Sequence, residues 1–501
     1  MRIWLLLFLL VPTLLLSQVL DSTNLKKNES SRSIYIGSIL GSSNTPFWFK
    51  ANQYGTIPVN TPALHINANA FNTILLKNQN WKFGYGFEVV GNIAKSSQFL
   101  LPQAYLKLNF KTWELYVGRR KELFGIADST IGTGSYSWSG NALPIPKIQL
   151  SIPEYRFVRY TRNWVAVKGT FSHGWFGNEK FVNHYFLHQK SFYMRIAKPN
   201  GNFKLYGGFT HNAQWGGRAA YEAPLTVGND FPSSFTDYVY VVMGRNLNYG
   251  RIFGKPSPLT HFDSTNRIGN HLGTIDIGFD YEFKKYILTF YRQNIFEDGS
   301  LYYLTNIADG LNGLTLRRKK LKLVNKRVLI SKLNVEFLYT LSQGGSVAGN
   351  QYQVWGKDNY FNHGQFRDGW WYRGRMIGTP FITNRFDSKE EFQQFGMYNG
   401  IENANNNRVR VYHVGLEGYY GKNLHFITKL SLSHNYGTYD FPYPETPKQF
   451  SGLILLDGKT NWLEGMKWTV TAGFDYGKLY NNSFALQIGL RKTWGTVLRN
   501  Y

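Results

Sequence analysis

The sequence predicts an all-β fold, namely a single transmembrane antiparallel β-barrel with long extracellular loops and few short helices. The length fits about 18 strands, and any number from roughly 14 to 20 would also fit. Three observations support this prediction. The chain begins with the layout of an export signal, many later segments alternate apolar and polar residues, and short polar turns alternate with long irregular stretches. No later segment approaches the ~18 uninterrupted apolar residues of a membrane-spanning helix, so a helical membrane protein is excluded.

The N-terminal segment has the features of a secretory signal peptide. Arg2 supplies a positive end, residues 3–16 are almost wholly apolar, and Ser17 is a small residue at the expected cleavage site. The apolar stretch of roughly fourteen residues is too short for a membrane anchor, which needs ~20. We therefore expect residues 1–17 to be removed and residues 18–501 to form one β-barrel domain.

The rest of the chain alternates apolar and polar residues with a period of two. The clearest segments are residues 81–89, 104–110, 113–117, 275–283, 468–476 and 484–490. Successive side chains of a strand face opposite sides, so each segment has one apolar face and one polar or small face. A soluble β-sandwich would bury the apolar face in a core, whereas an outer-membrane barrel exposes it to lipid. The export signal and the rings at segment ends, such as Trp81, Trp113 and Trp468, favour the barrel.

Connections of two kinds separate these segments. The short polar turns, expected on the periplasmic side, are Lys111-Thr112, Lys284-Lys285 and Gly421-Lys422-Asn423. The long irregular stretches, expected as outer loops, run over residues 120–155, 212–270, 297–327 and 343–408. Within the last stretch, Ser388 and Glu391 fit a capping box, which predicts a short helix.

No motif identifies an enzyme. The absence of cysteine excludes a disulfide scaffold, a thiolate metal site, a catalytic thiol and a lipoprotein anchor. His184 and His188 have a metal-like spacing, but no Glu follows His184 and no third ligand is evident. We therefore predict a non-enzymatic protein without a cofactor or metal. A hydrolase whose carboxylates are paired by the fold stays open as the last-ranked alternative.

The charge balance points to an anionic partner. The chain has 56 Lys+Arg against 31 Asp+Glu, a formal net charge of +25. Such a balance attracts nucleic acid, lipid phosphates or acidic polymers. Export argues against nucleic acid, and no nucleic-acid-binding module is visible. The expected partners are an acidic capsular or extracellular polysaccharide and the lipid and lipopolysaccharide of the outer membrane, with the protein acting as a monomer.

Candidate polysaccharide-binding residues combine cations with rings in the presumed loops. Rings stack on apolar sugar faces, and Arg donates hydrogen bonds to hydroxyls and carboxylates. The candidates are Arg119, Arg120, Lys121, Trp215, Arg218, Arg317, Arg318, Lys319, Lys320, Arg367, Trp370, Trp371 and Arg373. For each of them, loop solvation, contact with lipopolysaccharide phosphates or aromatic-girdle packing is an alternative explanation.

A passive, porin-like channel with an anion preference is the alternative function. Inward-facing cations would favour anions, and those expected are Lys82, Lys107, Lys429 and Lys467. The expected inward-facing acids are Glu88, Glu114, Asp276, Asp280 and Glu282. The lumen is therefore mixed in charge, which argues against strong selectivity.

Several segments together resemble the capsule assembly Wzi family of outer-membrane proteins, in the form common among Bacteroidota-type bacteria. They are NTPFWFKANQYGTI (44–57), GRRKELFG (118–125), SYSWSGNALPIPKIQLSIPEY (135–155), SHGWFG (172–177), DGLNGL (309–314) and GKDNYFNHGQFRDGWWYRGRMIGTPFI (356–382). The resemblance spans most of the chain after the signal segment. It implies a barrel of about 18 strands that acts as a lectin and helps to organise capsular polysaccharide, and not an enzyme. Enteric members carry a helical bundle beside the barrel, for which no equivalent amphipathic stretch is evident here. The resemblance identifies no sugar-binding residue.

Overall fold

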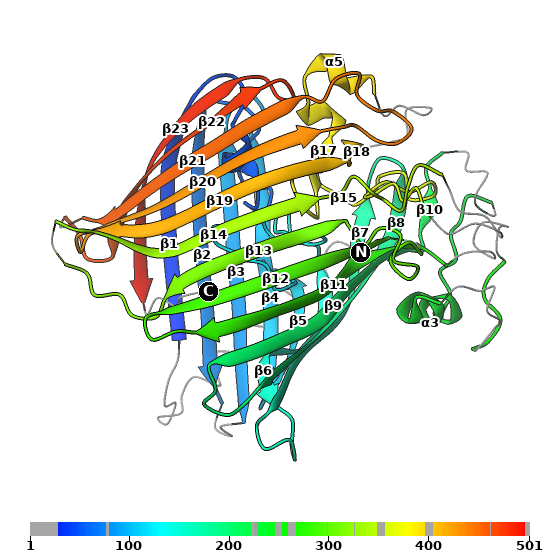
Figure 1. The fold of residues 1–501 in the computed structure, drawn as a ribbon, viewed down its shortest axis with the longest axis horizontal. Coiled ribbons are helices and arrows are strands. Elements are labelled where there is room, and N and C mark those ends of the chain that lie inside the picture. The colour runs from blue at the N-terminus through cyan, green and yellow to red at the C-terminus, as the bar shows by residue number, and fades with distance from the viewer. Residues whose placement is uncertain are drawn as a thin grey trace, which may run out of the picture.

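A closed barrel of 18 long antiparallel strands dominates the structure (Figure 1). The computed structural model describes residues 29–76, 80–221, 226, 228–245, 253–258, 267–297, 299–324, 326–347, 356–395, 404–460 and 462–495. The predicted signal peptide, residues 1–17, lies outside the described residues. In the described part of the chain, no helix has the length and apolar character needed to cross a membrane.

Each long strand pairs with the next along the chain, and the last pairs with the first. The strands are β1 (Glu29–Gly41), β2 (Ala63–Leu75), β3 (Trp81–Ile93), β4 (Gln98–Phe110), β5 (Trp113–Arg119), β6 (Lys147–Phe157), β7 (Val165–Asn178), β8 (Val182–Ala197), β9 (Phe203–Trp215), β11 (Asn270–Glu282), β12 (Tyr286–Glu297), β13 (Gly310–Arg318), β14 (Val328–Tyr339), β19 (Val409–Tyr420), β20 (Leu424–Asn435), β21 (Lys448–Lys459), β22 (Met466–Gly477) and β23 (Ser483–Gly495). Pairing of β1 with both β2 and β23 closes the barrel and leaves no unpaired edge among these strands.

The loops contain only short elements. The strands among them are β10 (Arg218–Ala219), β15 (Trp371–Tyr372), β16 (Arg375–Met376), β17 (Thr383–Asn384) and β18 (Ala404–Asn406). The helices are α2 (Phe47–Lys50), α3 (Phe235–Met243), the 3₁₀ turn η2 (Arg385–Asp387) and α5 (Glu390–Gln393). The predicted short helix near Ser388 is present, but Ser388 does not cap it. Its hydroxyl donates to the Arg385 carbonyl at 2.7 Å because Ser388 closes the preceding 3₁₀ turn.

The period-two alternation produces the two faces of the barrel wall. On β1, Ile34 and Ile36 are exposed on the outer face, whereas Tyr35 between them is buried on the inner face. On β23, Phe484 is exposed and Ala485 is buried in the same way. An outer surface of large apolar side chains is stable only against lipid, so the burial pattern is that of a membrane barrel.

Strand direction divides the connections between two ends. The predicted turns at Lys111, Lys284 and Lys422 all lie at one end, called here the short-turn end, together with the start of β1 and the end of β23. Residues 42–62, 120–146, 216–269 and 340–408 connect strands at the opposite, long-loop end (upper right in Figure 1). In bacterial outer-membrane barrels the short turns face the periplasm and the long loops face outside.

Two of the predicted irregular stretches are partly wrong. Residues 297–327 contain strand β13, and residues 120–155 contain the first part of β6. The glycines at both ends of GLNG (310–313) obscured the alternation in β13. As a consequence, residues 319–327 connect β13 to β14 at the short-turn end and are not part of an outer loop.

One segment of the loop between β5 and β6 crosses the lumen and bonds to several walls. The Thr133 amide donates to Glu336 on β14 at 2.5 Å, and the Tyr136 amide donates to Gln293 on β12 at 2.9 Å. The same segment reaches β9 through Ser137 and Thr210, β19 through Ile131 and His413, and β20 through Gly132 and Lys429. We call residues 128–141 the lumen-crossing segment.

An aromatic core forms around this segment inside the long-loop half of the lumen. Its members come from three loops and include Phe47, Trp48, Tyr136, Trp138, Tyr360, Phe361 and Trp370. The Trp370 indole N–H donates to the Ser137 carbonyl at 2.8 Å, and that of Trp48 donates to Ser431 on β20 at 3.1 Å. The three loops therefore plug the lumen as one packed unit.

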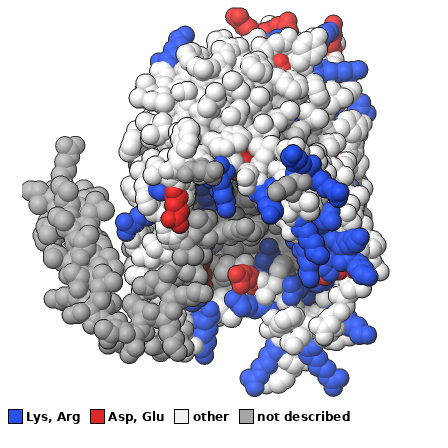
Figure 2. Space-filling view, turned by 90° about the vertical axis from the view of Figure 1, so that its left-hand side faces the viewer, with Lys and Arg blue, Asp and Glu red and all other residues white. Residues whose placement is uncertain are grey.

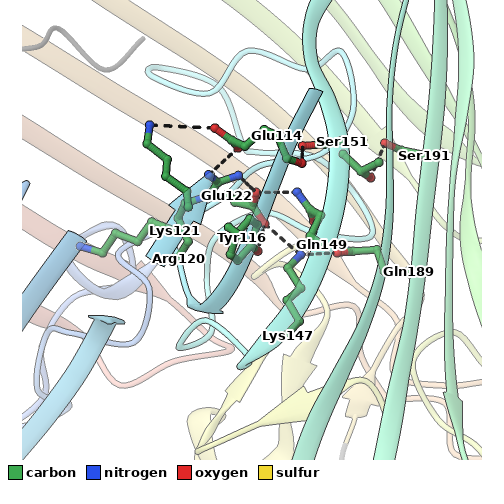
Figure 3. A network of polar contacts seen from close by, with 12 residues as sticks. Glu114, Tyr116, Arg120, Lys121, Glu122, Lys147, Gln149, Ser151, Gln189 and Ser191 are labelled. Carbon is green, nitrogen blue, oxygen red and sulfur yellow. Dashed lines mark hydrogen bonds and ion pairs between the residues drawn. The ribbon is translucent and has the colours of Figure 1, made fainter. Parts of the chain in front are cut away.

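A polar network joins the start of the loop between β5 and β6 to the barrel wall (Figure 3). The Glu122 carboxylate accepts hydrogen bonds from Tyr116 at 2.6 Å and from Gln149 at 2.9 Å. It also forms ion pairs with Arg120 at 2.6 Å and with Lys147 at 2.9 Å. Burial by itself raises the pKa of Glu122, but the cations outweigh that effect and hold its pKa at about 2.

We expect Glu122→Gln to reduce the free energy of unfolding by about 3–5 kcal/mol, because Lys147, only 2% exposed, would lose its carboxylate partner. Heat unfolding of the detergent-solubilised barrel, followed on unheated gels, measures the change. Glu154→Gln is the control, since its exposed pair with Arg156 contributes at most about 1 kcal/mol. Equal midpoints for the two variants would contradict the prediction.

Acid should weaken wild type more than Glu122→Gln. The folded pKa of Glu122 is about 2, below the roughly 4.3 of an unfolded glutamate. The stability that it contributes is therefore present above pH ~4.3 and is lost as the pH falls through the folded pKa. Unfolding midpoints between neutral and acid pH check this difference.

Replacement of residues 131–139 by a Gly-Ser linker of equal length should convert a nearly silent barrel into a steady channel, because this segment bonds to walls on several sides. Conductance in planar bilayers is the measurement. The same replacement of residues 439–447 in the loop between β20 and β21 is the control. Steady conductance of the wild-type barrel would show that the loops leave the lumen open.

Candidate functional site

A cleft of about 500 Å³ lies at the long-loop end, where four connections between strands meet. The β1–β2 loop contributes α2, the β5–β6 loop contributes Asn141, the β14–β19 loop contributes the segment from β15 to α5, and the fourth connection is the turn between β22 and β23. The side chains that matter below are Asn44, Lys50, Asn141, Trp371, Arg375, Asn384, Phe386, Asp387, Tyr480 and Asn481. The lumen plug forms its floor, since Phe47 and Met376 both line the cleft and belong to the aromatic core cluster.

Two cations in the cleft share one carboxylate. Lys50 Nζ and Arg375 Nη1 each lie 3.9 Å from Asp387 Oδ1, and their side chains are 18% and 11% exposed. Burial lowers the pKa of Lys50, and Asp387 offsets this only in part. At 3.9 Å neither contact is a tight charge-assisted hydrogen bond. Lys50 and Arg375 can therefore donate hydrogen bonds to a second anion.

Rings and amides surround these charges. Phe386 is 65% exposed, and Trp371 and Tyr480 are half-buried in the cleft wall. Asn141 and Asn384 use their amides to hold neighbouring backbone, at Met376 and Phe386 respectively. Aromatic faces beside amides and cations suit a ligand with apolar faces, hydroxyls and carboxylates.

The cluster Arg119, Arg120 and Lys121 lies inside the barrel, not on an outer loop. Arg120 pairs with Glu114 and Glu122, Lys121 pairs with Glu88 at 2.7 Å, and Arg119 donates to Tyr372 at 2.9 Å. Their placement corrects the expectation of a surface patch. Arg120 and Lys121 neutralise acids inside the lumen, where an unpaired buried carboxylate would be costly.

The cluster Arg317, Arg318, Lys319 and Lys320 lies at the short-turn end. Arg318 pairs in register with Tyr286 beside the Lys284-Lys285 turn, and Lys319 pairs with Glu282 at 3.0 Å. Its expected place in an outer loop is corrected by strand β13, which begins at the long-loop end and whose last two residues, at the opposite end, are Arg317 and Arg318. The cluster and the cleft therefore lie at opposite ends of the barrel.

The candidates between residues 215 and 218 sit beside α3. Trp215 is 5% exposed and stacks on Tyr238 of α3, with ring centroids 5.0 Å apart. Arg218 is open to solvent, 3.8 Å from Asp230. His188 lies near the same helix, with Nδ1 3.4 Å from the Tyr238 hydroxyl, and no group of three or more metal-ligating side chains occurs among the described residues.

The last group of candidates is split between the core and the surface. Trp370 is fully buried in the plug, and the Arg367 guanidinium lies over the Tyr221 ring at 3.7 Å. Arg373 is half exposed and lies 3.5 Å from Glu179, whose pKa is raised to about 6 by burial. Among all thirteen predicted residues, only Trp371 lines the cleft.

Sequence reasoning missed the charged residues of the cleft. Lys50 lies in the segment 44–57 that carries the family resemblance, but nothing there marks it as a ligand. Arg375 lies in β16 and Asp387 in η2, twelve positions apart in the loop between β14 and β19. The fold brings Lys50 to them from more than 300 positions away, so no local spacing could reveal the three together.

Comparisons with known proteins agree with this architecture. The structure is similar to that of Wzi from Escherichia coli, an outer membrane protein involved in group 1 capsule assembly that is described as a carbohydrate-binding β-barrel. The two chains are 14% identical, the match covers 97% of this chain and 88% of that chain, and the TM-score is 0.54. It also matches Acinetobacter baumannii OccAB4, with 10% identity, coverage of 95% and 100%, and a TM-score of 0.46. Pseudomonas aeruginosa OccK5 (OpdH) matches with 8% identity, coverage of 94% and 99%, and a TM-score of 0.43. A search of curated proteins finds no match.

The sequence itself matches a family model. The model for capsule assembly protein Wzi matches residues 37–385, which is well over half of the chain. The resemblance found in the sequence is thereby confirmed for the family, while the Bacteroidota-type lineage stays a prediction. The chain belongs to the capsule assembly protein Wzi family and is an outer-membrane β-barrel.

Proposed function

We propose that this protein is a non-enzymatic outer-membrane barrel that binds acidic capsular or extracellular polysaccharide at the cell surface and helps to organise or attach it. The observation that carries the proposal is the cleft at the long-loop end, where Lys50 and Arg375 share Asp387 beside exposed rings. Family membership and the carbohydrate binding described for Escherichia coli Wzi support it.

In this proposal, a carboxylate of the polymer binds between Lys50 and Arg375. It would replace part of their long contacts to Asp387 with shorter charge-assisted hydrogen bonds. Trp371 and Phe386 would stack on apolar sugar faces. Arg218 and Arg373, both exposed on the surrounding loops, would attract the rest of the polymer.

The packed loops favour a binding role over a passive channel. A channel needs a water-filled path, whereas Trp370, Tyr360 and Phe361 are fully buried in the lumen. We further propose that the barrel acts as a monomer, with lipid and lipopolysaccharide around its apolar outer face, and that residues 1–17 are removed on export.

Lys50→Gln should weaken binding to the producer's own extracellular polysaccharide about tenfold, or ~1.4 kcal/mol, because it removes one of two cations from the cleft. Binding to purified, detergent-solubilised protein is measured at low and high salt, beside a neutral glycan. High salt should weaken the native interaction, since exposed charges are screened.

The matched control is Lys478→Gln. Lys478 is also at the long-loop end, but its side chain is 68% exposed and pairs with Glu445 outside the cleft. Equal losses in the two variants would place binding on general surface charge. No binding by wild type at either salt concentration would overturn the proposed function.

A further inference from the structure

A second cavity, of about 550 Å³, lies on the other side of the plug. Its ceiling includes Gln53, Ile57 and Lys121 from the plugging loops, and its walls are the inner faces of β1 to β4 and β21 to β23. It extends toward the short-turn end, where Lys467 and Arg491 line it. The chamber therefore faces the periplasmic side of an outer-membrane barrel.

Three cations form a row across adjacent strands at this mouth. In the register of the sheet, Lys459 on β21 lies opposite Lys467 on β22, and Lys467 lies opposite Arg491 on β23. Like charges directly opposite each other in a sheet are destabilising. Figure 2, which views the side carrying the β19–β20 and β21–β22 turns, shows Lys and Arg gathered around a hollow.

The row lacks close carboxylate partners within the part of the chain that the structure describes. Among the described residues, none of the three cations forms an ion pair with Asp or Glu. Glu88 is engaged by Lys121 at 2.7 Å, and Asp457 by His425 at 2.7 Å. The acids of the chamber thus have other partners, and the row keeps its positive charge for a ligand.

The chamber also contains an aromatic ring and amide side chains of the kinds that bind sugars. The Arg491 guanidinium lies 5.0 Å from the centre of the Tyr35 ring, so a cation and an aromatic side chain face the same space. Amide side chains line the remaining wall, namely Gln53, Asn67, Asn69, Gln103 and Gln487. Cations bind carboxylates, and amides and a ring bind hydroxyls and apolar sugar faces.

We infer that this chamber is a second binding site, for a carboxylate-bearing saccharide segment that enters from the periplasmic side. The inference goes beyond the proposed function, since the plug separates the chamber from the outer cleft. The protein would then contact acidic polymer on both sides of its plug.

Fluorescein-labelled oligogalacturonate is the probe, with anisotropy measured on the detergent-solubilised full chain at low and high salt. Both double variants are made in the Lys50→Gln background, so that the weakened outer cleft contributes little to binding of the probe. Lys459→Gln/Lys467→Gln should then weaken its binding at least tenfold relative to Lys50→Gln alone. Lys284→Gln/Lys285→Gln removes the same charge from the turn between β11 and β12, several strands away at the same end, and should bind as Lys50→Gln alone does. Equal affinities of the row variant and Lys50→Gln alone would overturn the inference.

Competition separates the possible sources of the carboxylate. Displacement by unlabelled oligogalacturonate, but not by free galacturonate or inorganic phosphate at the same charge concentration, supports a saccharide site. Equal displacement by phosphate would overturn that assignment. Weaker binding of the native polysaccharide by Lys50→Gln, with the row intact, tests the outer cleft separately from the chamber.

Discussion

The requirement that buried polar groups find partners governs the inside of this barrel. Each strand presents polar side chains to the lumen, and a lumen filled by protein cannot leave them unbonded without a large cost. The lumen-crossing segment meets this requirement by bonding to Glu336, Gln293 and His413 on separate strands. Because the wall and the plug satisfy each other, the loops hold one arrangement across the lumen.

In the two proposals above, the plug separates the cleft from the chamber, so the two sites would not share a ligand path. At the long-loop end, several loops assemble the cleft around Lys50 and Asp387. On the periplasmic side, the strands themselves set the row from Lys459 to Arg491. The outer site is therefore built by loop packing, and the inner row by strand register.

The candidates whose positions were predicted wrongly show that a local sequence pattern does not determine whether a side chain lies on the surface or inside the lumen. A run such as Arg119 to Lys121 is basic in sequence, yet inside the lumen Arg120 pairs with Glu114 and Lys121 pairs with Glu88 of β3. Trp370 is part of a ring-rich run, but its indole donates to Ser137, 233 positions away. The sequence shows that cations and aromatic rings are present. It does not show whether these side chains already bond to or pack against residues elsewhere in the chain.

The sequence by itself determined the barrel, because alternation is a local property of neighbouring residues. It also determined the family, through the resemblance of several segments, and that resemblance implied about 18 strands. The signal peptide stays a prediction from the sequence. Tertiary structure alone decided which end Arg317 occupies, how the loops plug the lumen, and which cations stay available. Those outcomes depend on strand direction and on contacts between distant residues, as when Lys50, Arg375 and Asp387 meet in one cleft. No pattern within a single segment predicts that these three side chains lie together.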